Sequence, residues 1–368
     1  MNTRFITVAC VAAFAFSAAT AMPAFGGFKE AAKETKPTFG VRYRFETVEQ
    51  TGIDGRAGAS TARVRFGWVM AASEGFSAGM QADYVSKLGP EEYNSTDNGR
   101  TEFPVVADPT GFDLNQAFLR YRKGPVTVTA GRQRIAHAGQ QFVGFKAWRQ
   151  NEQSFDALRV EAADSHLLRA SWTPAEGHSL GAFNYLLDFE KDNGPANSNA
   201  TFGVDYTAAV GSLGLAASVG RQRDWGEQPV QYDAPYYAVE TRWTPAGAKF
   251  ALGWEVFGSD GGVATVQTPL GAEHICRGSA GKFAAVKPAM GLEDLYVSAS
   301  GKVGPMTFAA TVHTYHSRRG DLDQGTEAGV SAAYARESLS LLLKLARYEA
   351  DQHATDTTKA WIMLGYSL

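Results

Sequence analysis

The chain has 368 residues, a formal net charge of -3 at pH 7 and two cysteines, and 20% of its residues are charged. A charge so nearly balanced predicts no nucleic-acid partner, because such partners select a clear excess of Lys and Arg. Beyond the N-terminal segment, no stretch reaches the roughly 18 apolar residues of a membrane helix. Membrane-spanning strands, which need only about ten alternating residues each, are not excluded.

The first predicted element is a signal peptide over residues 1–21. An apolar run follows Arg4 and ends in a small-residue A-x-A site, so we expect cleavage after Ala21. The mature chain would then keep Cys276 alone and could form no internal disulfide. The polar, Lys- and Glu-rich residues that follow predict a periplasmic N-terminal lead-in over 22–38.

From residue 39 onward the chain alternates between apolar and polar residues, with the period of two that is typical of strands. We predict sixteen strands: 39–49, 60–72, 76–88, 112–123, 126–136, 155–173, 179–190, 200–211, 213–224, 235–244, 248–258, 293–303, 305–316, 327–336, 339–350 and 357–368. Segment 155–173 is unusually long, but its alternation continues throughout, so we interpret it as one strand. Eighteen strands is the alternative.

The connections between these strands alternate strictly between short turns and long polar loops. Short turns on one rim and long loops on the other are typical of outer-membrane barrels, whose long loops face outward. Both chain ends then fall on the short-turn, periplasmic side, which requires an even number of strands. We therefore predict an all-β protein in which 39–368 form a single closed antiparallel transmembrane β-barrel of the bacterial outer membrane.

The last strand carries a further signal. Residues 359–368 alternate up to an apolar C-terminus, with Tyr366 two residues before Leu368. This pattern resembles the C-terminal signal of bacterial barrel proteins, although Phe is usual at the final position. It predicts the barrel-insertion machinery as a partner.

The aromatic residues indicate which face of each strand contacts lipid and which contacts water. In a membrane barrel, the apolar alternates face lipid and the polar ones line the lumen, and aromatic girdles mark the two interfaces. The apolar faces here carry such aromatic residues: Tyr43, Phe45, Trp68, Trp172, Tyr206, Trp243, Trp254 and Tyr366. We therefore expect the outer wall to contact membrane lipid and lipopolysaccharide.

The polar faces carry many arginines, often two residues apart. The predicted pore-lining, solute-binding residues are Arg42, Arg44, Arg63, Arg65, Arg120, Arg122, Arg134, Arg159, Arg169 and Arg242, with the acids Glu46, Glu161 and Glu240. Asp205, Glu255, Asp294 and Lys344 share these faces. Guanidinium groups stay charged and bind carboxylates in a forked geometry, so the set favours a path for acidic solutes. The alternative is that these charges pair with one another and brace the wall.

Several stretches resemble the alginate-export family of outer-membrane barrels and its porin-like relatives. They are EEYNSTDNG (91–99), PVVADP (104–109), LNQA (114–117), GRQRI (131–135), WRQNEQ (148–153), FDA (155–157) and YLLDF (185–189). The resemblance covers most of 39–210 and, more loosely, the C-terminal half. It implies an Arg-lined lumen that conducts anionic sugar polymers or small acids. Members of the family commonly have extra strand material after the FDA segment, so this chain is expected to be one hairpin shorter.

The sequence thus predicts an outer-membrane porin for passive diffusion of small hydrophilic, anionic solutes, as a homotrimer or a monomer. The alternative is an exporter of an anionic polysaccharide such as alginate. No nucleophile signature supports a barrel enzyme, so we predict no catalytic residues, metal site or cofactor. Segment 148–153 either folds inward as a constriction or packs as ordinary loop structure.

Overall fold

The computed structural model describes residues 35–70, 73–124, 126–162, 165–166, 169–189, 195–272, 274, 277–283 and 287–368. Strands dominate these residues, and two short 3-10 helices, Ala138–Gln140 and Pro195–Asn197, lie in connections. No helix in this part of the chain is long and apolar enough to span a bilayer. The predicted signal peptide, its cleavage site and the lead-in as far as residue 34 lie outside the described residues.

Eighteen strands of the described chain form one antiparallel sheet. They are β1 (Lys36–Gln50), β2 (Ala57–Val69), β3 (Phe76–Lys87), β4 (Gly111–Lys123), β5 (Val126–Gln133), β6 (Phe155–Ala162), β7 (Ser165–His166), β8 (Arg169–Trp172), β9 (His178–Leu187), β10 (Asn199–Val210), β11 (Leu213–Arg223), β12 (Asp233–Trp243), β13 (Ala248–Phe257), β16 (Leu292–Val303), β17 (Met306–His316), β18 (Asp323–Arg336), β19 (Leu339–Glu349) and β20 (Thr357–Ser367). A separate two-stranded sheet, β14 (Ser259–Asp260) and β15 (Ala264–Thr265), lies in the connection between β13 and β16.

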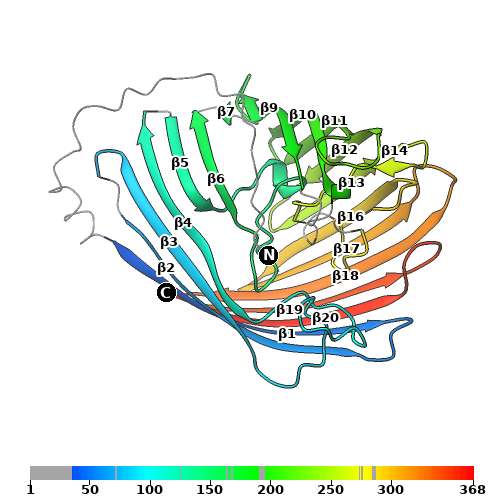
Figure 1. Ribbon diagram of the computed structural model, residues 1–368, viewed down its shortest axis with the longest axis horizontal. Helices are drawn as coiled ribbons and strands as arrows, with labels where there is room; N and C mark the ends of the chain where they lie inside the picture. Colours follow the sequence, from blue (N-terminus) through cyan, green and yellow to red (C-terminus); the bar gives the residue numbers. More distant parts are fainter. Residues whose placement is uncertain are drawn as a thin grey trace.

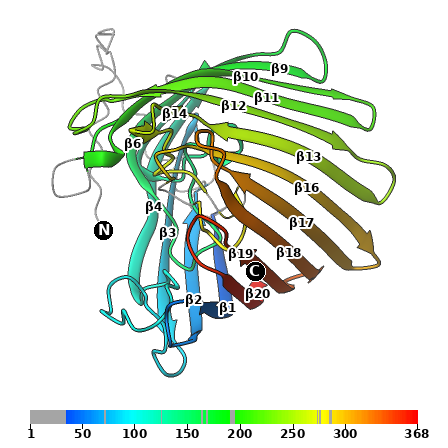
Figure 2. The ribbon, with the colours of Figure 1, turned by 90° about the vertical axis from the view of Figure 1, so that its right-hand side faces the viewer.

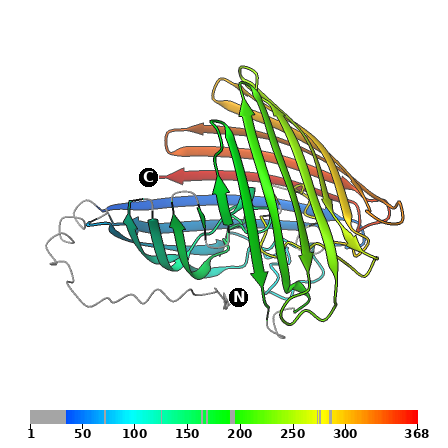
Figure 3. The same cartoon turned by 90° about the horizontal axis from the view of Figure 1, so that it is seen from above.

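Each strand of the large sheet pairs with its neighbour in the chain, and β13 pairs with β16. The last strand returns to the first: β20 pairs with β1 from Gly40 opposite Ser367 to Gln50 opposite Thr357. Figures 1 and 3 show β20, in red, beside β1, in blue. The sheet therefore curves around a central space, which we call the lumen (Figure 2).

Fifteen of the sixteen predicted strands are confirmed to within a few residues. The strict alternation of short and long connections is not, because the β1–β2 and β2–β3 connections, 51–56 and 70–75, both have six residues and the break around β7 adds consecutive short connections. The short turns use left-handed backbone where the chain reverses in two residues. Gly211 and Gly304 each have φ 58°, which costs a glycine little because it has no Cβ.

The prediction of one long strand over 155–173 is wrong, because the structure divides it into β6, β7 and β8. β6 and β8 both pair antiparallel with the two-residue β7 between them. Leu158 and Trp172 are both exposed, at 68% and 63%, so the residues before and after the break keep one phase. Alternation alone therefore could not reveal the break.

The burial pattern is the reverse of that in a soluble sheet. Leu252 on β13, Val297 on β16 and Leu343 on β19 are 44–56% exposed on the outer face. Charged side chains on the inner face, such as Arg44 and Asp294, are fully buried. The prediction that apolar alternates point outward and polar ones inward is therefore confirmed.

A hydrophobic core lies inside the sheet and is built from both loops and strands. Phe142, Leu270 and Phe283 from long connections pack with Tyr315 and Tyr348 from the wall. A smaller cluster joins Tyr93 and Val106 of the loop after β3 to Val48, Ala57 and Ala59 of β1 and β2. Loop residues thus fill part of the lumen.

Candidate functional site

Loop 134–154, which follows β5, folds into the lumen and lies against β1 and β2. Arg42 Nε donates to Gln150 Oε1 at 2.9 Å, and Arg44 Nη1 donates to the carbonyl oxygen of Trp148 at 2.8 Å. Gln150 is fully buried. The WRQNEQ segment thus lies inside the sheet and packs against its wall, which combines the inward path of one alternative with the packing of the other.

Four arginines of β1 and β2 and two of this loop meet in one network of ion pairs and hydrogen bonds. We call it the arginine cluster: Arg42, Arg44, Arg63, Arg65, Arg134 and Arg149, with Glu46, Asp83, Asp108 and Glu152. Register brings it together, because Arg42 of β1 lies directly opposite Arg63 of β2. Two guanidinium groups opposite each other repel unless acids or carbonyl groups separate them.

Glu152 at the end of the loop is the acid that joins the most arginines in the cluster. Its carboxylate lies 2.7 Å from Arg65 Nη2, 2.6 Å from Arg134 Nε and 3.4 Å from Arg63 Nη1, and its side chain is 3% exposed. Asp83 binds Arg65 from the neighbouring strand β3 at 2.6 Å. Charge-assisted bonds of this kind are short and directional, so the loop end is fixed against the wall.

The arginine cluster is positive overall, since it contains six guanidinium groups and four carboxylates. Its interior is closed to solutes: the side chains of Arg44 and Glu46 are fully buried against each other at 2.5 Å. Its edge is open, because the side chains of Arg134 and Arg149 are each 26% exposed. The members of the arginine cluster therefore differ in exposure, with Arg44 and Glu46 buried and Arg134 and Arg149 partly exposed.

The remaining predicted pore-lining arginines of the early strands lie apart from these contacts. Arg120 and Arg122 lie at the short-turn end of β4, and Arg159 lies on β6. The side chains of Glu161 and Arg169 lie outside the described part of the structure. Arg242 and Glu240 pair with each other on β12, on another side of the lumen.

A second long connection, 258–291, also enters the lumen and joins the first. Gly144 N donates to the carbonyl oxygen of Leu270 at 2.9 Å, and Ala272 N donates to that of Gln140 at 2.9 Å. We call 134–154 and 258–291 the crossing loops. Because they share backbone hydrogen bonds, they form one unit inside the lumen.

Trp148 lies where the crossing loops meet the wall. Its ring stacks on His274 at 3.8 Å, with Arg44 5.0 Å from the ring centroid and Lys344 Nζ 4.8 Å from it. Lys344 Nζ donates to His274 Nε2 at 2.9 Å. Burial, reinforced by Lys344, holds the pKa of His274 well below its ordinary value, so the ring is neutral and can accept this bond.

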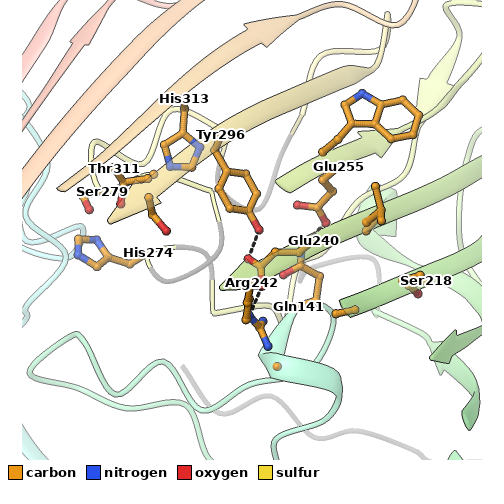
Figure 4. A pocket seen from close by; sticks show the side chains of 18 of the residues that line it. Gln141, Ser218, Glu240, Arg242, Glu255, His274, Ser279, Tyr296, Thr311 and His313 are labelled. Carbon is orange, nitrogen blue, oxygen red and sulfur yellow. Dashed lines mark hydrogen bonds and ion pairs between the residues drawn. The ribbon is translucent and has the colours of Figure 1, made fainter. Parts of the chain in front are cut away.

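Between the crossing loops and the wall of β9 to β19 lies a cavity of about 800 Å³. Figure 4 shows Glu240, Arg242 and Tyr296 together on one side of it. The charged side chains that line it are Asp205, Glu240, Arg242, Glu255, Glu327 and Lys344. This side of the lumen is thus richer in carboxylates, whereas the arginine cluster lies across the loops.

Arg44, Glu46 and Arg63 are buried on the inner face, as their alternation predicts, but alternation does not identify their partners. Asp83, Asp108 and Glu327 were not among the predicted site residues, and all three are at most 2% exposed. A charged residue in phase with a polar strand face was the available signal for Asp83. Asp108 lies in a loop, which lacks the alternation that predicts the direction of a side chain in a strand.

Known proteins resemble the chain at two levels. The family described as alginate export matches residues 36–173. No curated protein sequence matches the chain significantly.

Solved structures of outer-membrane porins resemble it in fold. Acinetobacter baumannii OccAB2 has a TM-score of 0.67 at 13% identity, covering 91% of this chain and 98% of its own. Pseudomonas aeruginosa OpdO has 0.66 at 12%, covering 91% and 97%, and A. baumannii OccAB4 has 0.65 at 12%, covering 91% and 98%.

At such low identities, these structures show the fold alone. Together with the match over 36–173, they confirm that the chain resembles the alginate-export and porin-like barrels of the bacterial outer membrane.

Proposed function

We propose that the protein is a porin of the bacterial outer membrane, through which small hydrophilic solutes diffuse passively. The proposal is supported by the pairing of β20 with β1, together with an apolar outer face and buried charged side chains on the inner face. A closed sheet leaves no unpaired edge, as a spanning sheet in lipid requires. No catalytic group or cofactor is needed for this activity.

The proposed barrel has sixteen spanning strands. β7 and β8 have two and four residues, too few for the roughly nine to eleven that a tilted spanning strand needs. Counting both as spans would give eighteen, the alternative. The outer wall would contact lipid and lipopolysaccharide, strand 359–368 would be read by the insertion machinery, and the barrel would act as a monomer or homotrimer.

The size of the solute is limited by the crossing loops. A cavity of about 800 Å³ falls within the roughly 300–1,000 Å³ of sites that hold small molecules. A polysaccharide would have to pass the same crossing loops as an extended chain. The match to the alginate-export family supports polymer export as the second candidate.

Anion preference is the finer part of the proposal. Fixed rings or clusters of one charge set the ion preference of a pore. The arginine cluster has an excess of positive charge and exposes Arg134 and Arg149 at its edge. The carboxylates across the lumen oppose this preference, so a moderate anion selectivity is expected.

Planar bilayers test the proposal directly. The mature protein should form open channels, and their reversal potential in a salt gradient should have the sign of anion selectivity. Sugars of one or two rings should swell loaded liposomes, whereas alginate oligomers should not. Channels closed to small ions would refute the porin function, a cation-selective reversal potential would refute only the anion preference, and free passage of alginate oligomers would favour export.

A further inference from the structure

Two carboxylates of the lumen wall bind the crossing loops rather than each other. Glu255 lies on β13 and Glu327 on β18, and they are 4% and 2% exposed. They come from strands remote in the chain from the arginine cluster. A buried carboxylate is costly unless it accepts several hydrogen bonds, so its partners show what it holds.

The partners of Glu327 belong to loop 258–291. Its Oε1 accepts the backbone N–H of Ala280 at 3.1 Å and that of Ser279. Gly278 immediately precedes these donors with φ 79°, and a Cβ there would lie 2.4 Å from Glu327 Oε2. The loop therefore needs glycine at 278 to approach the carboxylate.

The partners of Glu255 include a side chain of loop 134–154. Gln141 Nε2 donates to Glu255 Oε1, and Tyr236 Oη of the neighbouring strand donates to the same oxygen at 2.7 Å. Figure 4 shows Gln141 pointing at Glu255. One wall carboxylate thus binds each crossing loop.

Because the loops are bonded to each other, both carboxylates act on one unit. Gly271 adds to this, since a Cβ there would lie 2.4 Å from the carbonyl oxygen of Gln141. The arginine cluster holds the same unit from β1 through Arg42 and Arg44 and from β2 through Arg63. The crossing loops are therefore bonded to two parts of the wall, β1 and β2 on one side and β13 and β18 on the other.

We infer that Glu255 and Glu327 are positioning residues, which hold the crossing loops inside the lumen and thereby set the largest solute that can pass. This role rests on the proposed porin function. Neither residue needs to touch the solute, and their effect is on channel width.

Truncation of the carboxylates tests the inference. Glu327→Ala and Glu255→Ala, separately and together, should raise single-channel conductance and admit polyethylene glycols that the wild-type channel excludes. Glu327→Gln keeps an oxygen that accepts the two N–H groups, so it should retain the wild-type size limit. Glu240→Ala removes a carboxylate from the same cavity whose partners, Arg242 and Tyr296, are both on the wall. It should change the reversal potential but not the size limit.

A loop-side variant tests the same contact while leaving the wall carboxylates in place. Gly278→Ala places a methyl group against Glu327 and Tyr315 of the wall and should widen the channel. Gly281→Ala is the matched control, because Gly281 has φ 73° but its nearest neighbour would be Lys359 Nζ at 3.9 Å. It carries the same backbone strain without the clash and should keep the wild-type limit.

The outcomes separate the two proposals. A wild-type protein that forms no channel would refute the porin function. A conducting wild type whose size limit is unchanged in Gly278→Ala and in the folded carboxylate variants would overturn the positioning role. A size limit that shifts equally in Glu240→Ala or Gly281→Ala would also overturn it.

Discussion

At the scale of single residues, the position of each charged side chain in the lumen depends on the groups that it binds. Glu152 alone binds three guanidinium groups, and Arg42 binds the loop through an amide oxygen and backbone carbonyl groups. Such a network fixes side chains that would otherwise repel each other. The net charge of the arginine cluster therefore depends on its four acids.

Replacing Glu152 by Gln should make the channel more anion-selective and less stable. Three arginines lose their shared carboxylate, and breaking a buried ion pair typically costs about 3–5 kcal/mol. The reversal potential in a salt gradient and the midpoint of denaturant unfolding measure the two effects. Glu102→Gln, at an exposed loop acid paired with Arg100, is the control and should change neither. An unchanged reversal potential in Glu152→Gln would show that the cluster lies off the conduction path.

Acid should loosen the contact between the crossing loops and the wall at Trp148. The pKa of His274 is lowered in the folded protein, so the unfolded loop takes up a proton first as the pH falls. The stability that His274 contributes is present above its ordinary pKa, near about 6.5, and is lost below it. Unfolding midpoints between pH 8 and pH 5 should fall less steeply in His274→Phe, which keeps the stack on Trp148. Equal slopes in the two proteins would contradict the assignment.

At the scale of elements, period-two alternation predicts where strands lie but not where they break or how the loops fold. The strands from Leu213–Arg223 to Thr357–Ser367 follow the predicted ranges closely. The break into β6, β7 and β8 is silent in that pattern, because the phase is the same on both sides. The paths of 134–154 and 258–291 depend on contacts between residues more than a hundred positions apart, which one sequence does not show.

Adjacent residues of β16 should respond oppositely to the same substitution. Val297 is 56% exposed on the outer face, so Val297→Arg should cost about 2–4 kcal/mol, as a charge does in the middle of a lipid-facing strand. Ser298 lines the cavity, so Ser298→Arg should leave folding intact and reduce conductance. Heat-modified migration on gels reports folding, and bilayer recordings report conductance. A folded, normally conducting Val297→Arg protein would contradict the assigned lipid-facing surface.

At the scale of the whole molecule, the first and last described strands, β1 and β20, pair within one sheet. Leu368 N still donates to the carbonyl oxygen of Phe39 at 3.0 Å, so pairing extends to the last residue. The terminal strand was interpretable from sequence because its alternation runs to the C-terminus. Its partner followed from the even number of predicted strands, and β1–β20 pairing confirms it.

Deleting 359–368 should abolish assembly rather than weaken it. Both β1 and β19 would then have an unpaired edge, which lipid does not tolerate. Loss of heat-modifiable protein from the membrane fraction is the expected result. Leu368→Ala keeps every backbone pair, and its membrane yield should remain measurable. Normal membrane insertion of the truncated chain would refute the closed barrel.

The wall of the sheet and the hydrophobic core inside it are stabilised by different interactions. The wall is held by hydrogen bonds between strands and by its surroundings, whereas Phe142, Leu270 and Phe283 pack as they would in a small water-soluble domain. Water, not lipid, is the solvent against which that inner core competes. Urea at concentrations too low to unfold the wall should therefore unfold the crossing loops and the inner core first. The wall would then stay folded while the size limit of the channel increases.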